Sequence, residues 1–441
     1  MSSYKPFSLA LCLLCAALPA RAEKPNDNRN DSRSSGALQR TDNGYTKEWG
    51  GKSIHEWIRD LEHSDPTNRV EAMIALQYFK QSADAMPDIL KRLARDGDAS
   101  VRVKAAMLPK LIPHHPVHRT RIISALAHAL HHDPQSVVRY EAAVSLQFYC
   151  PLNFNEEKER DVLQDLVAGL NQGVTYELRE ACIVALMKAG VDPNKGPDPR
   201  VTDALVARAN PVYEAAMRVR VKAIMCLGGQ GRPRDPKKLN SVMNVLQMPA
   251  NYSKRAHPVV RIWAHVAVIA LQVEEKDNKK ELDAIAEYLT HKEAAIRTEA
   301  VSALGALRER SQAYIDDVLK LLKRNDNPPA VKAAGAEALG HMKNTGQKVI
   351  SVLIRLTEED EPESFITVWS ACRALALLAP NSAEVRNALD KVLEHKSLQK
   401  WQRMIIKKGI EEIENPPKKQ IAKDPPKNPD KGIAPKQNKN R

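Results

Sequence analysis

The stretch Arg69-Val-Glu-Ala-Met-Ile-Ala-Leu76 decides the fold, because its pattern recurs along the whole chain. A basic residue is followed three residues later by Ala and seven residues later by Leu, and clear copies begin at Arg139, Arg220 and Arg297. Weaker copies are centred on Arg102, Arg179, Arg261, Lys332, Val368 and Arg403. These ten anchor residues are spaced 33 to 41 residues apart, which is the period of stacked helical repeats rather than of one globular core.

Each copy of the pattern has the features of the second helix of a helix pair. Asp65-Pro66 and Asp133-Pro134 place a capping carboxylate before a proline that fits a first helical turn. The Ala and Leu of the pattern lie on one helix face and would pack against a neighbouring helix. Helix-period segments run from Trp49 to Glu414, and alternating β-branched runs are absent. The sequence therefore predicts an all-α chain of about ten helix pairs.

This pattern resembles the HEAT-repeat family, and in particular the short HEAT-like repeats of the bilin-lyase type, in an exported bacterial form. The resemblance implies an α-solenoid, a right-handed superhelix of helix pairs in which the second helices, called B, line the concave side and the first helices, called A, lie outside. The chain departs from the family pattern at Pro109, at Val368 and Trp369, and in long loops at 191–199 and 229–236. The repeat boundaries at those positions are open.

Composition excludes several other classes of protein. With 43% hydrophobic and 27% charged residues in 441, the chain can bury a large aliphatic core and is not disordered throughout. Six Cys and 18 Gly are too few for a disulfide scaffold or a collagen-like repeat. Most of the formal net charge of +13 lies at the two ends, with +2 in residues 1–22 and +6 in residues 415–441.

The two ends predict export and a basic tail. Residues 1–22 read as a signal peptide, with Lys5 before an apolar run and a cleavage site after Ala22. A disordered polar leader, the repeat solenoid and a disordered Lys/Pro-rich basic tail are then expected at 23–48, 49–414 and 415–441. The mature protein is expected in the periplasm or outside the cell, with no transmembrane segment. Four mature cysteines are expected mainly as buried free thiols: Cys150, Cys182, Cys226 and Cys372.

Motifs that would support catalysis are weak. Six of the 13 histidines lie between His114 and His132, and His128 with His132 and Asp133 has spacing that could bind a metal ion, although surface histidines are the simpler interpretation. Enzymes of the HEAT-like group with a di-iron site use several His-Glu pairs, whereas only His55-Glu56 has that form here. Glycine-rich phosphate loops and nucleophile motifs are absent. We therefore expect no enzyme activity, metal or cofactor, with a metalloenzyme as a remote alternative.

The residues one and five positions after each anchor form a candidate binding surface. They share one side of helix B, and in the first six repeats eleven of the twelve are apolar. The members of this apolar stripe are Val70, Ile74, Val103, Met107, Tyr140, Val144, Val184, Val221, Met225, Ile262 and Val266. The stripe predicts a concave surface for an extended or helical polypeptide. The alternative is that strong curvature buries these side chains between adjacent B helices.

The basic anchors themselves are predicted to be structural. A column of Arg side chains could reach the Asp-rich turns and form a ladder of hydrogen-bonded pairs along the stack. The ladder consists of Arg69, Arg102, Arg139, Arg179, Arg220, Arg261 and Arg297. A phosphate-binding stripe is the alternative interpretation.

The function most consistent with the sequence is non-covalent binding of another macromolecule. The sequence predicts an exported scaffold or adaptor that binds a protein partner, with the concave B-helix surface as the contact. The alternative is a structural or polyanion-binding envelope protein, tethered to an acidic polymer or envelope surface by the basic tail. Few exposed aromatic pairs are expected, so nucleic acid is not an expected partner.

Overall fold

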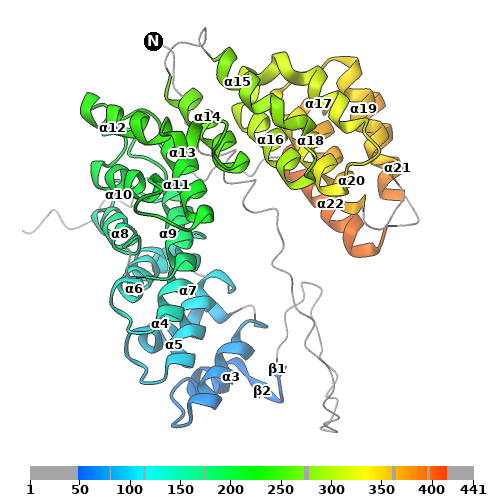
Figure 1. Ribbon diagram of the computed structural model, residues 1–441. Coiled ribbons are helices and arrows are strands. Elements are labelled where there is room, and N and C mark those ends of the chain that lie inside the picture. The colour runs from blue at the N-terminus through cyan, green and yellow to red at the C-terminus, as the bar shows by residue number, and fades with distance from the viewer. Residues whose placement is uncertain are drawn as a thin grey trace, which may run out of the picture.

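The computed structural model describes residues 48–414, apart from 80, 113–115, 172–173, 273–277, 360–363 and 395–397. Within these residues the chain forms ten consecutive helix pairs stacked side by side (Figure 1). The A helices are α2 (Ile54–Asp60), α4 (Met86–Arg95), α6 (Arg119–His132), α8 (Glu157–Ala168), α10 (Pro199–Ala209), α12 (Pro236–Leu246), α15 (Lys279–Ala286), α17 (Ile315–Leu322), α19 (Gln347–Thr357) and α21 (Ala383–Glu394).

The B helices each contain one anchor residue as their fourth residue. They are α3 (Pro66–Leu76), α5 (Ala99–Met107), α7 (Ser136–Leu146), α9 (Tyr176–Ala189), α11 (Met217–Gly229), α14 (Pro258–Leu271), α16 (Ala294–Leu307), α18 (Pro329–Met342), α20 (Phe365–Leu378) and α22 (Lys400–Glu414). The one-turn helix α13 (Pro249–Tyr252) precedes α14, and short 3-10 turns flank several helices. The predicted all-α solenoid is confirmed, since every repeat of the sequence pattern corresponds to one helix pair.

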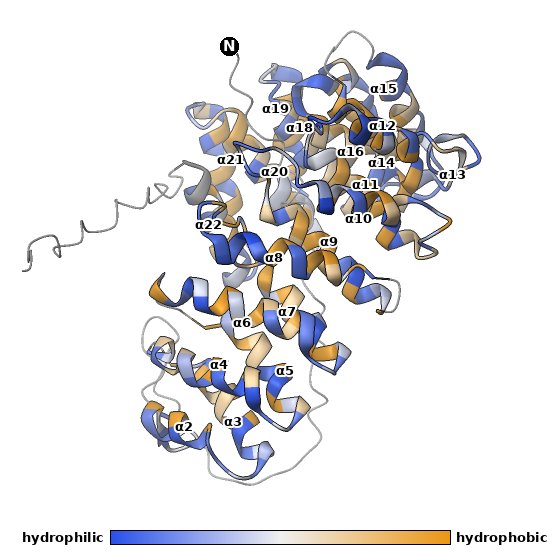
Figure 2. Cartoon of the chain, turned by 90° about the vertical axis from the view of Figure 1, so that its left-hand side faces the viewer, coloured by the Kyte–Doolittle hydropathy of each residue, from blue (hydrophilic) through white to orange (hydrophobic). Residues whose placement is uncertain are grey.

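The stack is curved, with the B helices on its inner side. Figure 1 shows the chain rising through α3, α5, α7, α9 and α11, turning at α14, and continuing through α16, α18, α20 and α22 around a hollow. The A helices lie on the outer side of this path, and in Figure 2 hydrophilic and hydrophobic stretches alternate along α4, α6 and α8. That alternation is typical of helices with one buried face.

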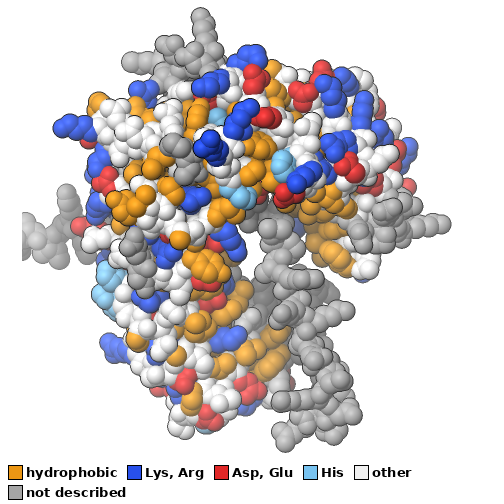
Figure 3. Space-filling view, in the orientation of Figure 1, with side chains coloured by type: hydrophobic (Ala, Val, Ile, Leu, Met, Phe, Trp, Pro, Cys, Tyr) orange, Lys and Arg blue, Asp and Glu red, His pale blue; other side chains and the backbone are white. Residues whose placement is uncertain are grey.

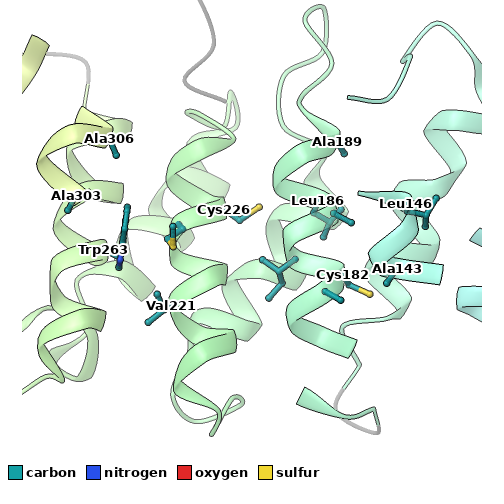
Figure 4. Close-up of a cluster of buried hydrophobic side chains, with 14 of the residues drawn as sticks. Ala143, Leu146, Cys182, Leu186, Ala189, Val221, Cys226, Trp263, Ala303 and Ala306 are labelled. Carbon is teal, nitrogen blue, oxygen red and sulfur yellow. The ribbon is translucent and has the colours of Figure 1, made fainter. Parts of the chain in front are cut away.

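The core is a continuous layer between neighbouring B helices and their A partners. Ala72 and Leu76, the Ala and Leu of the first copy of the pattern, are fully buried. Figure 4 shows the equivalent contacts further along the stack, with side chains between successive B helices, such as Ala143, Leu146, Cys182, Leu186, Cys226 and Trp263. Each pair is therefore covered by its neighbours, as expected of a repeat protein.

The helix starts follow the predicted capping chemistry in part. The Asp65 carboxylate accepts a hydrogen bond of 2.8 Å from the backbone N–H of Thr67, and Pro66 is the first residue of α3. Asp133, however, does not cap α7, which begins at Ser136 with Gln135 as its N-cap. Asp133 is instead the C-cap residue of α6, and its carboxylate accepts a hydrogen bond of 2.9 Å from the N–H of Gln135. The second Asp-Pro pair was thus assigned to the wrong helix terminus.

A short hairpin precedes the first helix. β1 (Glu48–Trp49) pairs antiparallel with β2 (Lys52–Ser53), so the repeat region begins with a two-stranded turn and its first helix starts at Ile54. The Trp57 indole N–H donates a 2.9 Å hydrogen bond to the Trp49 carbonyl and fixes the hairpin on α2. The predicted signal peptide, leader and basic tail lie outside the described residues, and the division into these segments stays a prediction.

The B helices approach one another most closely in the second half of the stack. A Cβ on Gly228 of α11 would lie 2.8 Å from Cα of Ala267 in α14, and one on Gly305 of α16 would lie 2.8 Å from Cα of Ala338 in α18. Real Cβ atoms do not approach backbone this closely, so glycine at these positions allows the tight packing. The corresponding positions of the first two repeats are Gln77 and Lys110, which lie just beyond the ends of α3 and α5.

Candidate functional site

The apolar stripe is accessible in the first four repeats. Tyr140 of α7 is 37% exposed, and the other members on α3, α5, α7 and α9 are half-buried. These half-buried members are Val70, Ile74, Val103, Met107, Val144 and Val184. In Figure 3, hydrophobic side chains gather on the side of these repeats that faces the hollow. The first four repeats therefore present part of the predicted concave surface to solvent.

The stripe is not a surface in the fifth and sixth repeats. Val221 and Met225 of α11 are 7% and 6% exposed, and Ile262 and Val266 of α14 are 0% and 4% exposed. Their burial follows from the close approach of α11 and α14 at Gly228, which closes the space in which these side chains would meet a ligand. The prediction of a binding role was wrong for these four residues, which are core.

The structure adds three exposed residues that the sequence interpretation missed. Tyr78, Leu111 and Phe148 lie nine positions after the anchors of the first three repeats, and they are 41%, 48% and 63% exposed. All three lie just beyond the last residue of their B helix, since α3, α5 and α7 end at Leu76, Met107 and Leu146. We call the accessible stripe residues on α3, α5, α7 and α9, together with these three residues at the helix ends, the concave row. The predicted spacing covered only positions inside the helices and so did not include them.

Aromatic side chains extend the concave row to the start of the solenoid. The rings of Trp49 and Tyr78 are stacked with their centroids 5.6 Å apart, and the rings of Trp49 and Trp57 meet edge-to-face with centroids 5.5 Å apart. The hairpin therefore places one indole ring directly beside the exposed Tyr78. Aromatic groups of this kind supply large contact areas with little loss of side-chain entropy on binding.

Three carboxylates lie near Tyr140, and two of them are paired with cations. Burial raises the pKa of the Tyr140 hydroxyl, and the nearby carboxylates of Glu141, Glu180 and Glu177 raise that pKa further. Glu180 is 3.3 Å from the guanidinium of Arg218, and Glu141 is 2.9 Å from the ammonium of Lys110. The row thus combines apolar and aromatic side chains with a border of mostly paired charges around Tyr140.

Four of the ladder arginines form forked contacts between consecutive repeats. Arg69 donates from Nε and Nη2 to the Asp96 carboxylate at 2.8 and 2.7 Å, and from Nη1 to the carbonyls of His63 and Ser64. Arg102, Arg179 and Arg297 make the equivalent contacts with a side chain in the next repeat and a carbonyl of their own A–B turn. Protein acceptors thus occupy these guanidinium groups, which favours a structural role over phosphate binding.

The other three ladder arginines differ. Arg261 donates to the Tyr288 hydroxyl at 2.9 Å and lies 3.6 Å from Glu287. The Nε atoms of Arg139 and Arg220 are buried without a hydrogen-bond partner in the part of the chain that the structure describes. Burial holds the pKa of Arg220 below its ordinary value. The ladder is therefore discontinuous at the third and fifth repeats.

The histidines do not assemble a metal site in the described residues. The rings of His128 and His132 lie 4.6 Å apart, and His131 is bound to Asp165 through a 2.8 Å contact from Nδ1. Across the described ranges, no group of three or more His, Cys, Asp or Glu side chains could hold a metal ion. His114 lies outside these ranges. Cys182, Cys226 and Cys372 are buried, and Cys150 is half-buried with its thiol against backbone carbonyls.

Buried His265 predicts a loss of stability in acid. Burial, followed by the charges of Arg261 and Lys280, lowers its pKa to about 3, and neither ring nitrogen has a hydrogen-bond partner among the described residues. The neutral form is favoured in the folded state, so stability is complete above the unfolded pKa near 6.5 and is lost as pH falls toward 3. We expect a loss of about 3 kcal/mol between pH 6.5 and 4 from this group.

Urea titrations at pH 7 and pH 4 measure this effect. His265→Phe removes the titrating group, so its two free energies of unfolding should differ by less than those of the wild type. Half-buried His341, whose pKa is lowered to about 4 mainly by desolvation, leaves a smaller pH dependence of the free energy of unfolding in the same direction. The exposed His55→Phe variant serves as control and should keep the wild-type pH dependence, because the His55 side chain lies at the surface. If the free energy of unfolding changed by the same amount between pH 7 and pH 4 in the wild type and in His265→Phe, the acid effect would not come from His265.

The fold and concave row define an α-solenoid of ten helix pairs with an apolar inner surface at its N-terminal half. No protein-family model matches the chain, and no curated protein matches it. Among the described residues, no helix combines the length and apolar character needed to cross a membrane.

Several solved structures align with most of the chain. An engineered protein aligns over 81% of this chain and 98% of its own, with 16% sequence identity and a TM-score of 0.35. The karyopherin Kap121p, in its crystal structure bound to the extreme C-terminus of the protein phosphatase Cdc14p, aligns over 81% of this chain with 13% identity and a TM-score of 0.38. The structure of Kap121p bound to the SUMO protease Ulp1p gives the same values. The alignment spans 41% of the karyopherin chain.

Proposed function

We propose that this protein is a non-catalytic helical-repeat scaffold that binds a polypeptide partner along the concave row of α3, α5, α7 and α9. The observation that carries the proposal is the exposure of Tyr140 beside half-buried aliphatic residues of α3, α5, α7 and α9, with exposed Tyr78, Leu111 and Phe148 just beyond the ends of the first three of these helices. Isolated exposed apolar residues are ordinary, whereas a contiguous row on several consecutive helices is typical of a binding surface.

The spacing of the B helices suits a polypeptide. Packed helices lie about 8 to 10 Å apart, so a chain crossing them meets a new repeat about every three residues if extended and about every seven residues if helical. Apolar side chains at either spacing would enter the row one per repeat.

Polar replacement of the exposed residues tests the concave row. The variant Leu111→Ser/Tyr140→Ser/Phe148→Ser removes side chains that are 48%, 37% and 63% exposed, so each substitution should change the free energy of unfolding by less than about 1 kcal/mol. Affinity for the partner recovered from the native host should fall by about tenfold or more, because the contact loses its apolar anchors. Affinity is measured by titration of the purified partner.

The matched control is Val212→Ser, which removes a 76% exposed side chain outside the row and should leave affinity unchanged. Deletion of residues 415–441 provides the second comparison. Tail-mediated attachment to a polyanion would be abolished by that deletion and would weaken steeply with salt, whereas apolar contact would change little. Wild-type affinity in the triple variant would contradict the proposal and favour the polyanion-binding alternative.

We also propose that the protein is exported. The support is the sequence of residues 1–22, which ends with Ala20-Arg21-Ala22 after an apolar run. The protein isolated from its host should begin at Glu23, as read by mass spectrometry of its N-terminal peptide. An intact N-terminus carrying Met1 or Ser2 on the mature protein would contradict export.

A further inference from the structure

The chain enters the solenoid directly beside the concave row. Glu48 and Trp49 form strand β1, the first described element. The Trp49 ring stacks on Tyr78 with the two centroids 5.6 Å apart, and the Trp49 carbonyl accepts a hydrogen bond of 2.9 Å from the Trp57 indole. The segment that precedes Glu48 is therefore tethered at the first exposed residue of the row.

From this entry point the row leads along consecutive repeats. Tyr78, Leu111 and Phe148 occupy equivalent positions of three repeats, in which α3 packs on α5 and α5 packs on α7. They are 41%, 48% and 63% exposed, and half-buried Met107 and Val144 belong to the same row. Because neighbouring helices lie about 8 to 10 Å apart, Leu111 is about one such step from Tyr78 and Phe148 about two.

The segment before β1 carries two large apolar side chains that can reach this row. They are Leu38 and Tyr45, within residues 36–47. An extended chain spans about 3.3 Å per residue. Tyr45 precedes β1 by three residues and so reaches about 10 Å, whereas Leu38 precedes it by ten residues and reaches about 33 Å. These reaches cover the steps to Leu111 and to Phe148.

Tethering lets a weakly binding segment occupy the row. A short linker gives the tethered segment an effective concentration in the millimolar range, and contacts by two apolar side chains suffice for a dissociation constant of that order. The basic tail at residues 415–441 lacks this advantage, because it follows α22 at the opposite end of the stack from the hairpin (Figure 1). Residues 36–47 are therefore the occupant that the entry point favours.

We propose that residues 36–47 bind along the concave row of their own chain, with Tyr45 against Leu111 and Leu38 against Phe148, and that a partner displaces them. The displacement rests on the proposed function, whereas the contact itself exists without a partner. Because the partner binds only the fraction of molecules whose row is free, the segment lowers the apparent affinity of the row. The row thereby rejects weakly binding polypeptides.

Photo-crosslinking within the purified full chain tests the contact. A photo-crosslinking amino acid replaces Phe148 or, as control, the exposed Arg121 on the outer helix α6. An equal mixture of unlabelled and isotope-labelled protein is irradiated, and mass spectrometry of the digest separates crosslinks within one chain from those between two copies. We expect residues 36–47 of the same chain to be crosslinked from Phe148 with a yield about fivefold or more above that from Arg121. Absence of that crosslink, or crosslinks from Phe148 only to residues 415–441 or to a second copy, would overturn the proposal.

Polar replacements in the segment test which side chains make the contact. Leu38→Ser/Tyr45→Ser should lower the yield of the crosslink about fivefold or more, because both apolar contacts are lost. Thr41→Ser/Asn43→Ser leaves the two apolar residues in place, so this matched control should crosslink as the wild type does. Equal yields from the two variants would refute the assignment of Leu38 and Tyr45.

Competition with the partner is measured separately, by titration of the purified partner. Leu38→Ser/Tyr45→Ser should bind the partner about threefold or more tightly than the wild type, because its row is free more of the time, and the control variant should show wild-type affinity. Unchanged affinity in the first variant would refute displacement. The crosslinking needs no partner, so its failure rejects this contact and leaves the proposed function standing.

Discussion

Replacing Arg297 with methionine is expected to lower the free energy of unfolding by about 3 kcal/mol, because the buried Asn327 amide oxygen and two carbonyls of the turn lose a charged donor. Arg297 is 2% exposed. Its guanidinium donates to Asn327 Oδ1 at 2.8 Å and to the carbonyls of His291 and Lys292 at 2.8 and 2.9 Å. Methionine fills much of the same volume, so the loss comes from acceptors left without a donor rather than from a cavity.

The neighbouring Arg324 supplies the matched control. Its side chain is 35% exposed and pairs with Asp326 at 2.7 Å, the carboxylate that also lies 3.7 Å from Arg297. Exposed pairs of this kind contribute about 1 kcal/mol or less, so Arg324→Met should be nearly neutral in urea titrations. Similar losses for the two variants would show that the ladder contact does not hold these repeats together.

Replacing Gly305 with valine is expected to destabilise the protein by about 3 kcal/mol or more, since overpacking against backbone cannot be relieved by a side-chain rotation. Even the Cβ alone would lie 2.8 Å from Cα of Ala338 and 2.9 Å from its Cβ. Helix propensity acts in the opposite direction, because glycine inside a helix costs about 1 kcal/mol relative to alanine. Gly305→Ala should therefore also destabilise, although propensity alone predicts a gain.

Gly97 is the control for this substitution. It lies in the loop before α5, and a Cβ there meets nothing within 4 Å. Gly97→Val should change the free energy of unfolding by less than about 1 kcal/mol. A Gly305→Ala variant more stable than the wild type would mean that α16 and α18 can separate without cost, and the explanation given for their close packing would be wrong.

The positions of the B helices were predictable because local rules and packing agree there. An anchor such as Arg69 is the fourth residue of its helix, Ala72 and Leu76 fall on the buried face, and Asp65 caps the start. These features depend on residues within one turn or two of one another. The same local pattern occurs in every repeat, so weak individual signals reinforced one another.

The accessibility of the apolar stripe depends on neighbouring repeats and could be predicted only in part. Val103 and Val221 occupy the same position after their anchors, yet Val103 is half-buried and Val221 is 7% exposed. The difference arises from the small residues that let α11 approach α14, which Gly228 makes possible. Such a contact joins residues about forty positions apart, one repeat unit. The contact between the two long loops, in which Gly196 lies against Arg234, also depends on tertiary structure, because the two residues come from different repeats.

The most direct test of the central claim maps the bound partner onto the surface. A photo-crosslinking amino acid is placed at Tyr140 or Phe148 on the concave row, and at Arg121 on α6 as an exposed outer position, and crosslinking is carried out in the native host. We predict that one polypeptide partner is crosslinked from Tyr140 and Phe148 and is absent from Arg121. Crosslinking of that partner from Arg121, with none from the concave positions, would contradict the account.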